Sequence, residues 1–152
     1  MGVKAKLFFA HTKKEFKTQI EILSVVNENH NIIIQEFVKD SFGRDIRVYV
    51  LGGRPIAAMI RQAQDGEFKA NITHGGTGTN FEITPEVSWL SIEAARILDL
   101  DIAGVDLLFD GSGYKICEVN SNPGFAGLEK ATGVNIPENI FEWLRIKTCK
   151  YI

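Results

Sequence analysis

Two pairs of β-forming segments, each joined by a short glycine-containing turn, restrict the possible folds of this chain more than any other feature. The turns are Gly52-Gly53-Arg54-Pro55, between residues 44–51 and 56–61, and Asp110-Gly111-Ser112-Gly113, between residues 102–109 and 114–120. Turns of this composition connect antiparallel neighbours. Because helical patterns surround the hairpins without a regular strand–helix alternation, we expect an α+β fold, a largely antiparallel sheet with flanking helices.

The remaining segments divide into helices, strands and one long loop. Hydrophobic spacing predicts helices over residues 13–26, from Thr84-Pro85 to about residue 98, and over 137–147, with Thr12 and Thr84 as N-caps. Residues 7–10 and 32–38 are apolar and predict strands, the second one buried. Glycine-rich residues 64–84 predict a long mobile loop that contacts substrate. The residues expected to face the core are Val87, Leu90, Ala94, Ile97, Leu98, Ile140, Phe141 and Leu144.

Composition excludes several classes of protein. With 152 residues and 45% hydrophobic residues, the chain is long enough to bury a core as one domain. A net charge of −2 gives no broad basic face, so nucleic acid is not an expected partner. No apolar run approaches the roughly 20 residues that cross a bilayer, so no membrane is expected. Two lone cysteines, Cys117 and Cys149, favour a reducing cytoplasm.

Oxygen-bearing side chains interrupt the second hairpin. Glu118 and Asn120 lie two residues apart and therefore share one face of their strand. Asp106 joins them if the connection is a three-residue loop, because Asp106 then lies opposite Glu118. Two carboxylates and an amide oxygen suit Mg²⁺ or Mn²⁺, which completes its coordination with water and substrate phosphates.

Two alternatives stay open on spacing alone. A two- or four-residue loop would turn Asp106 to the opposite face, because a slip of one residue reverses every side chain. The polar residues would also suit the solvated face of an edge hairpin. The following Pro123-Gly124 turn favours a site, because it fixes the backbone where a substrate could approach.

Cations opposite these carboxylates would suit a bound phosphate, because arginine can donate two hydrogen bonds to phosphate oxygens. The candidates on and after the second strand of the first hairpin are Arg61, Lys69 and Asn71, and the competing arginines are Arg44, Arg47 and Arg54.

Two other segments have the composition of nucleotide contacts. Glu36-Phe37 follows an apolar segment and offers a carboxylate, a backbone edge and an aromatic ring to a purine and ribose. The run from His74 to Gly78 has the composition of a phosphate-binding loop but lacks the Gly-Lys-Ser/Thr ending of a Walker motif. We interpret it as part of the mobile substrate loop.

Taken in order, these motifs resemble those of the RimK-type ATP-grasp ligases. The matching segments are Gln35-Glu36-Phe37, Asp45-Ile46-Arg47, Arg61, Lys69-Ala70-Asn71, Gly75-Gly76, Ala103-Gly104-Val105-Asp106 and Glu118-Val119-Asn120-Ser121-Asn122-Pro123-Gly124. The resemblance covers nearly the whole chain. It implies that residues 1–152 are a single domain, the C-terminal portion of an ATP-grasp fold, without the N-terminal domain and the first ATP-grasp subdomain. The chain would then be an excised piece, a truncated reading frame or half of a split enzyme.

The resemblance also implies roles for individual residues. Asp106, Glu118 and Asn120 match magnesium ligands. Glu36 and Phe37 match residues that hold adenine and ribose, and Asp45 matches a further nucleotide contact. Lys69 and Asn71 match residues near the phosphates, although the family often has arginine at the position of Lys69. Arg61 matches a phosphate-facing arginine and is the expected catalytic residue.

The implied activity is ATP-dependent carboxylate–amine ligation. The γ-phosphoryl group of ATP would pass to a carboxylate, and an amine would attack the resulting acyl phosphate. Glutamate or a similar amino acid would be added to a small molecule or a protein, a protein C-terminus included. The alternatives are a non-catalytic nucleotide-binding or partner-docking module and another ATP-grasp chemistry such as ligation of D-amino acids. A homo-oligomer stays open, and the isolated half-site is expected to be weak or inactive.

Overall fold

The computed structural model describes residues 8–26, 32–64 and 76–149. The chain divides into two compact units, residues 1–36 and 37–152, and each is described by itself. In the first unit, α1 spans Lys13–Val26, which confirms the predicted helix. The backbone N–H of Glu15 donates to Thr12 Oγ1 at 3.1 Å, so Thr12 caps the helix as expected.

The apolar segments on either side of α1 do not form strands. Residues 8–10 and 32–38 have no regular structure, and Ile33 is 84% exposed; Leu7 lies outside the described residues. The prediction of a buried strand over 32–38 is therefore wrong. β-Branched residues favour a strand only where a neighbouring backbone and a covering layer exist, and no described strand pairs with this segment.

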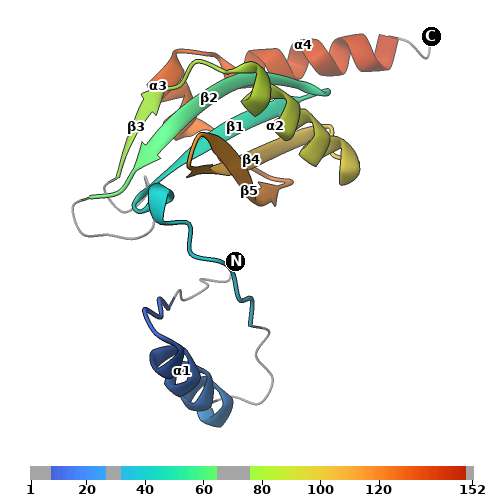
Figure 1. Cartoon of the computed structure of the whole chain (residues 1–152). Coiled ribbons are helices and arrows are strands. Elements are labelled where there is room, and N and C mark those ends of the chain that lie inside the picture. Colours follow the sequence, from blue (N-terminus) through green and yellow to red (C-terminus); the bar gives the residue numbers. More distant parts are fainter. Residues whose placement is uncertain (1–7, 27–31, 65–75, 150–152) are drawn as a thin grey trace. The chain divides into compact units, whose positions relative to one another are not determined.

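The second unit contains a five-stranded antiparallel sheet, which confirms the predicted α+β class (Figure 1). The spatial order of its strands is β3-β2-β1-β4-β5. The strands are β1 (Arg44–Leu51), β2 (Arg54–Gln62), β3 (Thr77–Asn80), β4 (Ile102–Asp110) and β5 (Gly113–Asn120). Both predicted hairpins are present. Because β1 pairs with β4, the two hairpins join into one surface.

Strand β3 lies within the segment that the sequence predicted as a loop. It pairs with β2 at the edge of the sheet, with Arg61 opposite Gly78. Thr77 and Thr79 are β-branched, which suits a short edge strand despite the surrounding glycines. The loop prediction is therefore wrong for β3, and residues 65–75 lie outside the described residues.

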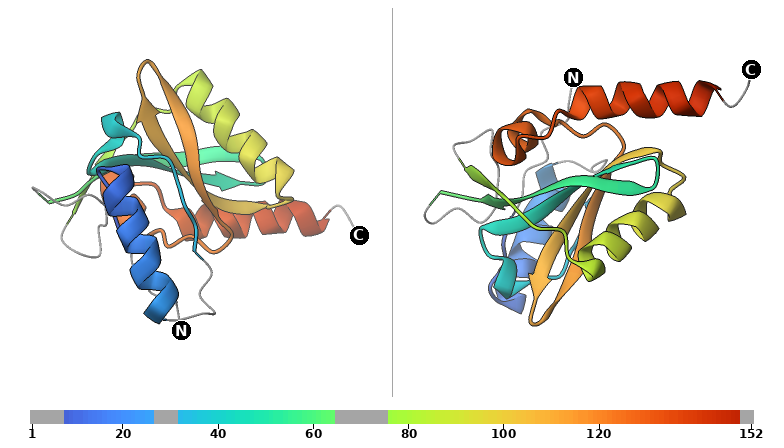
Figure 2. Two further views of the ribbon diagram at one scale, coloured as in Figure 1. Left: turned by 60° about the horizontal axis from the view of Figure 1, so that its bottom comes forward. Right: turned by 90° about the horizontal axis from the view of Figure 1, so that it is seen from above.

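Helices cover the two faces of the sheet separately. Helix α2 (Pro85–Ile97), with Thr84 as N-cap, packs Val87, Ala94 and Ala95 on one face. On the other face, the core contains Leu128 from α3 (Ala126–Thr132) and Ile136 from α4 (Ile136–Cys149). Figure 2 shows the sheet between α2 and α4. A short 3₁₀ helix, η1 (Lys39–Ser41), precedes β1. None of the helices in the described part of the chain is long and apolar enough to cross a membrane.

Both sheet-covering helices bury less of their predicted apolar face than expected. Ile97 and Leu98 are exposed at the end of α2, and Phe141 and Leu144 are exposed on α4. Ile140 does pack against the core. Trp143, later on α4, lies against Gly52, so the helix still contacts the sheet beyond Phe141, and Phe141 is exposed because it lies on a different side of the helix from Ile140 and Trp143.

The β1–β2 turn is where α4 meets the sheet, and it gives a first test of the fold. Gly52 has φ of 56°, and a Cβ atom there would overlap the indole ring of Trp143. We expect Gly52→Ala to lower the free energy of unfolding by about 2–4 kcal/mol, because it adds overpacking to left-handed backbone strain. Urea unfolding measures this loss.

Gly53→Ala is the matched control. Gly53 also has positive φ, 76°, but a Cβ atom there would have nothing within 4 Å. It should cost only about 1–2 kcal/mol of backbone strain. Equal losses in the two variants would show that Trp143 does not constrain the turn.

Candidate functional site

The register of β4 and β5 decides which side chains meet. Asp110 pairs with Gly113, so the turn contains two residues, Gly111 and Ser112, rather than the three expected. Asp106 nevertheless pairs with Glu118, because the register shifts between the pairs Leu107–Ile116 and Asp106–Glu118. Cys117 is the extra residue of a β-bulge. The predicted pairing is present, and the bulge restores the register that the shorter turn would have reversed.

Asp106, Glu118 and Asn120 therefore share one face of the sheet. Asp106 lies directly opposite Glu118, and Asn120 follows two residues later, opposite Gly104. The neighbours of Asp106 on β4, Val105 and Leu107, belong to the core under α2. The three oxygen-bearing side chains are thus on the face that α3 and α4 cover in part.

Two cross-strand pairs next to this set form a charged network. Arg47 on β1 lies opposite Asp106 and donates from Nε and Nη2 to its two oxygens, at 2.6 Å each. Arg61 on β2 lies opposite Asp45 and donates from Nε and Nη2 to Asp45 at 2.6 and 2.7 Å. Nη2 of Arg61 also donates to Asp106 Oδ2 at 2.7 Å, which joins the pairs.

The network is buried and has no net charge of its own. The side chain of Asp106 is only 8% exposed, and those of both arginines are 13% exposed. Burial alone would lower the pKa of Arg61, but hydrogen bonds and charges from Asp45 and Asp106 outweigh it and raise the pKa above its ordinary value. Arg61 therefore keeps its positive charge in this buried position.

A close contact between the backbone of Gly104 and the Pro123 ring fixes the position of Asn120 and of the turn that follows it. Gly104, opposite Asn120, has no side chain, and a Cβ atom there would lie 2.6 Å from Cβ of Pro123. Pro123 is buried at this point. The backbone N–H of Asn122 donates to Asn120 Oδ1 at 2.8 Å, which closes the turn. Gly104 thus lets the proline pack directly on the sheet next to the candidate metal ligands.

The other candidate residues divide into those placed elsewhere and those outside the described part. Arg44 stacks on the ring of Phe109, 4.4 Å from its centroid, and Arg54 is exposed next to the β1–β2 turn. Phe37 makes an edge-to-face contact with Phe42. Glu36 is exposed in the first unit. Lys69 and Asn71 lie outside the described residues.

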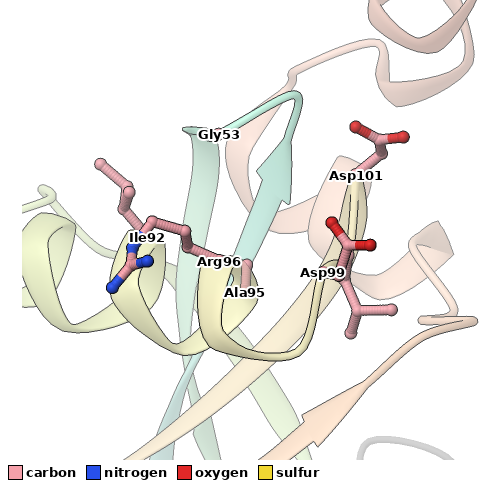
Figure 3. Close-up of a pocket in the computed structure, with 7 residues that line it drawn as sticks. Gly53, Ile92, Ala95, Arg96, Asp99 and Asp101 are labelled. Atoms are coloured by element: carbon pink, nitrogen blue, oxygen red, sulfur yellow. The ribbon is translucent and has the colours of Figure 1, made fainter.

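A pocket on the same unit does not coincide with this site. It lies where α2 turns into β4, and its lining includes Gly53, Arg96, Asp99 and Asp101 (Figure 3). Figure 3 shows the guanidinium group of Arg96 directed away from the two carboxylates. Arg96 pairs with Glu93 and Asp101 with Lys147. The polar groups do not converge on one point, so the pocket carries no functional assignment.

The donor set fits a hard divalent cation. Asp106 accepts three hydrogen bonds from arginines, and a carboxylate has about four lone-pair positions, so one remains. Glu118 and Asn120 add oxygens on the same face. No cluster of three His, Cys, Asp or Glu side chains suitable for a metal occurs in the described residues, so a metal here depends on Asn120. Few protein ligands are typical of magnesium, which keeps waters and substrate phosphates.

Comparison with known proteins identifies the family to which this chain belongs. The model of the "RimK-like ATP-grasp domain" matches residues 2–144. The chain belongs to the RimK-like ATP-grasp family. A probable alpha-L-glutamate ligase of Aeromonas salmonicida is 41% identical over 139 residues, which are 91% of this chain and 46% of the relative. One of Vibrio cholerae is 48% identical over 114 residues, 75% of this chain and 38% of the relative. The chain thus spans about half the length of the relatives it matches.

Solved structures agree with the ATP-grasp fold. The ATP-grasp ligase PsnB, in complex with a minimal precursor variant, Mg and ADP, has 27% identity and a TM-score of 0.59 over 75% of this chain and 34% of its own. A D-alanine–D-alanine ligase of Bacillus anthracis has 18% identity and a TM-score of 0.67 over 98% of this chain and 53% of its own. The second match supports the fold alone.

The sequence placed Arg47 in a matching motif and among the competing arginines but gave it no role, whereas in the structure it donates two hydrogen bonds to Asp106. Alternation within β1 places Arg47 on the face of Asp45, a signal that could have been used. Its pairing with Asp106 depends on the β1–β4 contact between distant segments, which no local pattern contains.

Proposed function

We propose that this chain is the metal- and phosphate-binding part of an ATP-dependent carboxylate–amine ligase. The observation that carries the proposal is the direct pairing of Asp106 with Glu118 beside two buried arginines. The relatives named as glutamate ligases favour glutamate or a similar amino acid as the substrate that is added. The acceptor is a carboxylate on a protein or small molecule. A cytoplasmic location remains the expectation from cysteine usage.

In this proposal Asp106, Glu118 and Asn120 hold Mg²⁺ or Mn²⁺. The ion, when bound, would neutralise phosphate oxygens of ATP. Arg61 keeps a positive charge and donates to the transferred phosphoryl group, where charge develops. The sheet holds these groups in fixed positions, so the contribution of the protein is orientation and electrostatics rather than a covalent nucleophile. Glu36, Phe37, Lys69 and Asn71 are proposed to contact the nucleotide.

Glu118→Gln is the sharpest test of the metal site. Glu118 is exposed and has no part in the arginine network, so the change removes a charged ligand and leaves the fold intact. We expect magnesium-dependent ATP binding, measured by calorimetry, to weaken by about 10–100-fold. The free energy of unfolding should change by less than about 0.5 kcal/mol.

Asp110→Asn is the control, because Asp110 is an exposed carboxylate on the same hairpin that pairs with Lys115. It should leave binding unchanged. Wild-type affinity in Glu118→Gln would contradict the metal site. Binding of ATP that is the same with and without magnesium would favour the non-catalytic nucleotide-binding module.

A further inference from the structure

The hydrogen bonds of Asp45 point to a role beyond the nucleotide contact that the family resemblance implies. Both of its oxygens accept from Arg61, at 2.6 and 2.7 Å. The two residues are also direct partners in the β1–β2 ladder, and their side chains are only 14% and 13% exposed. A carboxylate held in this way fixes the plane of its guanidinium partner, and about two of its four lone-pair positions stay open for another donor.

We propose that Asp45 is a positioning residue that fixes the orientation of Arg61, a role separate from the nucleotide contact that the resemblance implies. This inference rests on the proposed function, in which Arg61 faces phosphate. A guanidinium group is a planar fork. Two parallel hydrogen bonds through Nε and Nη2 therefore also fix the direction of Nη1. The hydrogen bonds of Arg61 to described residues use only Nε and Nη2.

Asp45 also prevents Arg61 from donating further hydrogen bonds to Asp106, which is a proposed metal ligand. Arg61 gives Asp106 a single hydrogen bond, while Arg47 gives it two. Without Asp45, Arg61 would have one buried carboxylate left as a partner and would turn toward Asp106, because a buried charge requires compensation. The last lone-pair position of Asp106 would then be taken by a guanidinium group. Asp45 thus gives the two arginines different roles. Arg47 binds Asp106, and Arg61 is oriented to bind phosphate.

Two probes distinguish positioning from direct nucleotide contact. Inorganic tripolyphosphate with Mg²⁺ has phosphates but no nucleoside, and the ATP analogue AMPPNP has both. If Asp45 positions Arg61, Asp45→Asn in the 152-residue chain should weaken both probes by about 10–100-fold, the range for residues that support a ligand contact. If Asp45 contacts the nucleoside and does not position Arg61, only AMPPNP should bind more weakly, and that result would overturn the proposal. Asp45→Glu, which keeps a carboxylate, should recover part of the lost affinity.

A second readout needs no ligand. In a ¹⁵N NMR spectrum, the Nε–H signal of Arg61 should exchange slowly with water in the wild type and several-fold faster in Asp45→Asn. The Nε–H signal of Arg47, which donates to Asp106, should be retained and also reports that the sheet is folded. Unchanged exchange at Arg61 would overturn the proposal even if the chain bound neither probe. Failure of the wild type to bind either probe would count against the proposed function only.

Discussion

Asp106→Ala is expected to lower the free energy of unfolding by about 3–5 kcal/mol, measured by urea denaturation without metal or nucleotide. Asp106 accepts hydrogen bonds from two buried arginines. Removing it leaves Arg47 without its bidentate partner and leaves a buried positive charge uncompensated. Breaking a buried ion pair from one side costs this much even where the intact pair contributes little.

Asp110→Ala is the matched control, because Asp110 is on the same strand four residues later. It is exposed and pairs with Lys115 at 3.2 Å. Solvent screens such a pair, so its removal should change stability by less than about 0.5 kcal/mol. A similar loss in both variants would show that the strand, and not the buried network, is sensitive to substitution.

A double variant separates the charge effect from the loss of packing. In Arg47→Met with Asp106→Leu, both partners become apolar and neither leaves a charge without a partner. Replacing a buried pair by apolar residues of similar size is often neutral or stabilising. We expect the double variant to be more stable than Asp106→Ala by at least about 2 kcal/mol. If it is equally unstable, the network does not account for the effect.

Gly104→Val is expected to weaken magnesium-dependent ATP binding by about 10–100-fold, through displacement of the turn that follows Asn120. A Cβ atom on residue 104 would lie 2.6 Å from Cβ of Pro123, and the next nearest atoms also belong to Pro123 and to Arg47. Because Pro123 is buried, it cannot move without moving its neighbours. Overpacking of this kind should also cost about 1–3 kcal/mol of stability. Calorimetry with ATP, with and without magnesium, measures the first effect.

Gly124→Ala tests whether any substitution near this turn would have the same result. Gly124 is one residue from Pro123, has no positive φ, and a Cβ atom there would have nothing within 4 Å. Binding and stability should both stay near the wild-type values. Equal weakening in the two variants would show that the close contact between residue 104 and Pro123 is not what holds Asn120 in place.

The parts of the fold that depend on local chemistry could be predicted from the sequence. The Gly52-Gly53 turn has positive φ at both residues, 56° and 76°, which glycine permits and which a type I′ hairpin turn requires. Helix α1 and its Thr12 cap follow from spacing and capping chemistry in the same way. These features depend only on residues that are neighbours in the chain, so they could be predicted from the sequence.

The pairing of Asp106 with Glu118 was predicted for an incomplete reason. The prediction relied on a three-residue turn, whereas the structure combines a two-residue turn with a bulge at Cys117. Either change alone would have placed Asp106 on the other face. Turn composition does not reveal a bulge several residues away, because the bulge depends on how β5 packs along the sheet.

Features that depend on distant partners could not be predicted. The role of Arg47 follows from the pairing of β1 with β4. The exposed conformation of Ile32 to Ile34 contradicts their strong strand propensity, since a strand requires a partner and none of the described strands pairs with this segment. Phe141 is exposed because the contacts of α4 with the sheet, through Ile140 and Trp143, turn Phe141 toward a different side of the helix. In each case the deciding contact joins segments that are far apart in the chain.

The bulge at Cys117 has a practical consequence for labelling this protein. It separates the register of the outer arm of the hairpin, which ends at Gly111 and Ser112, from that of the Asp106–Glu118 pair. The pair is also anchored from the other side by β1. A short affinity peptide inserted between Gly111 and Ser112 should therefore leave the pair in register, which makes the hairpin tip the natural attachment point for immobilising the molecule.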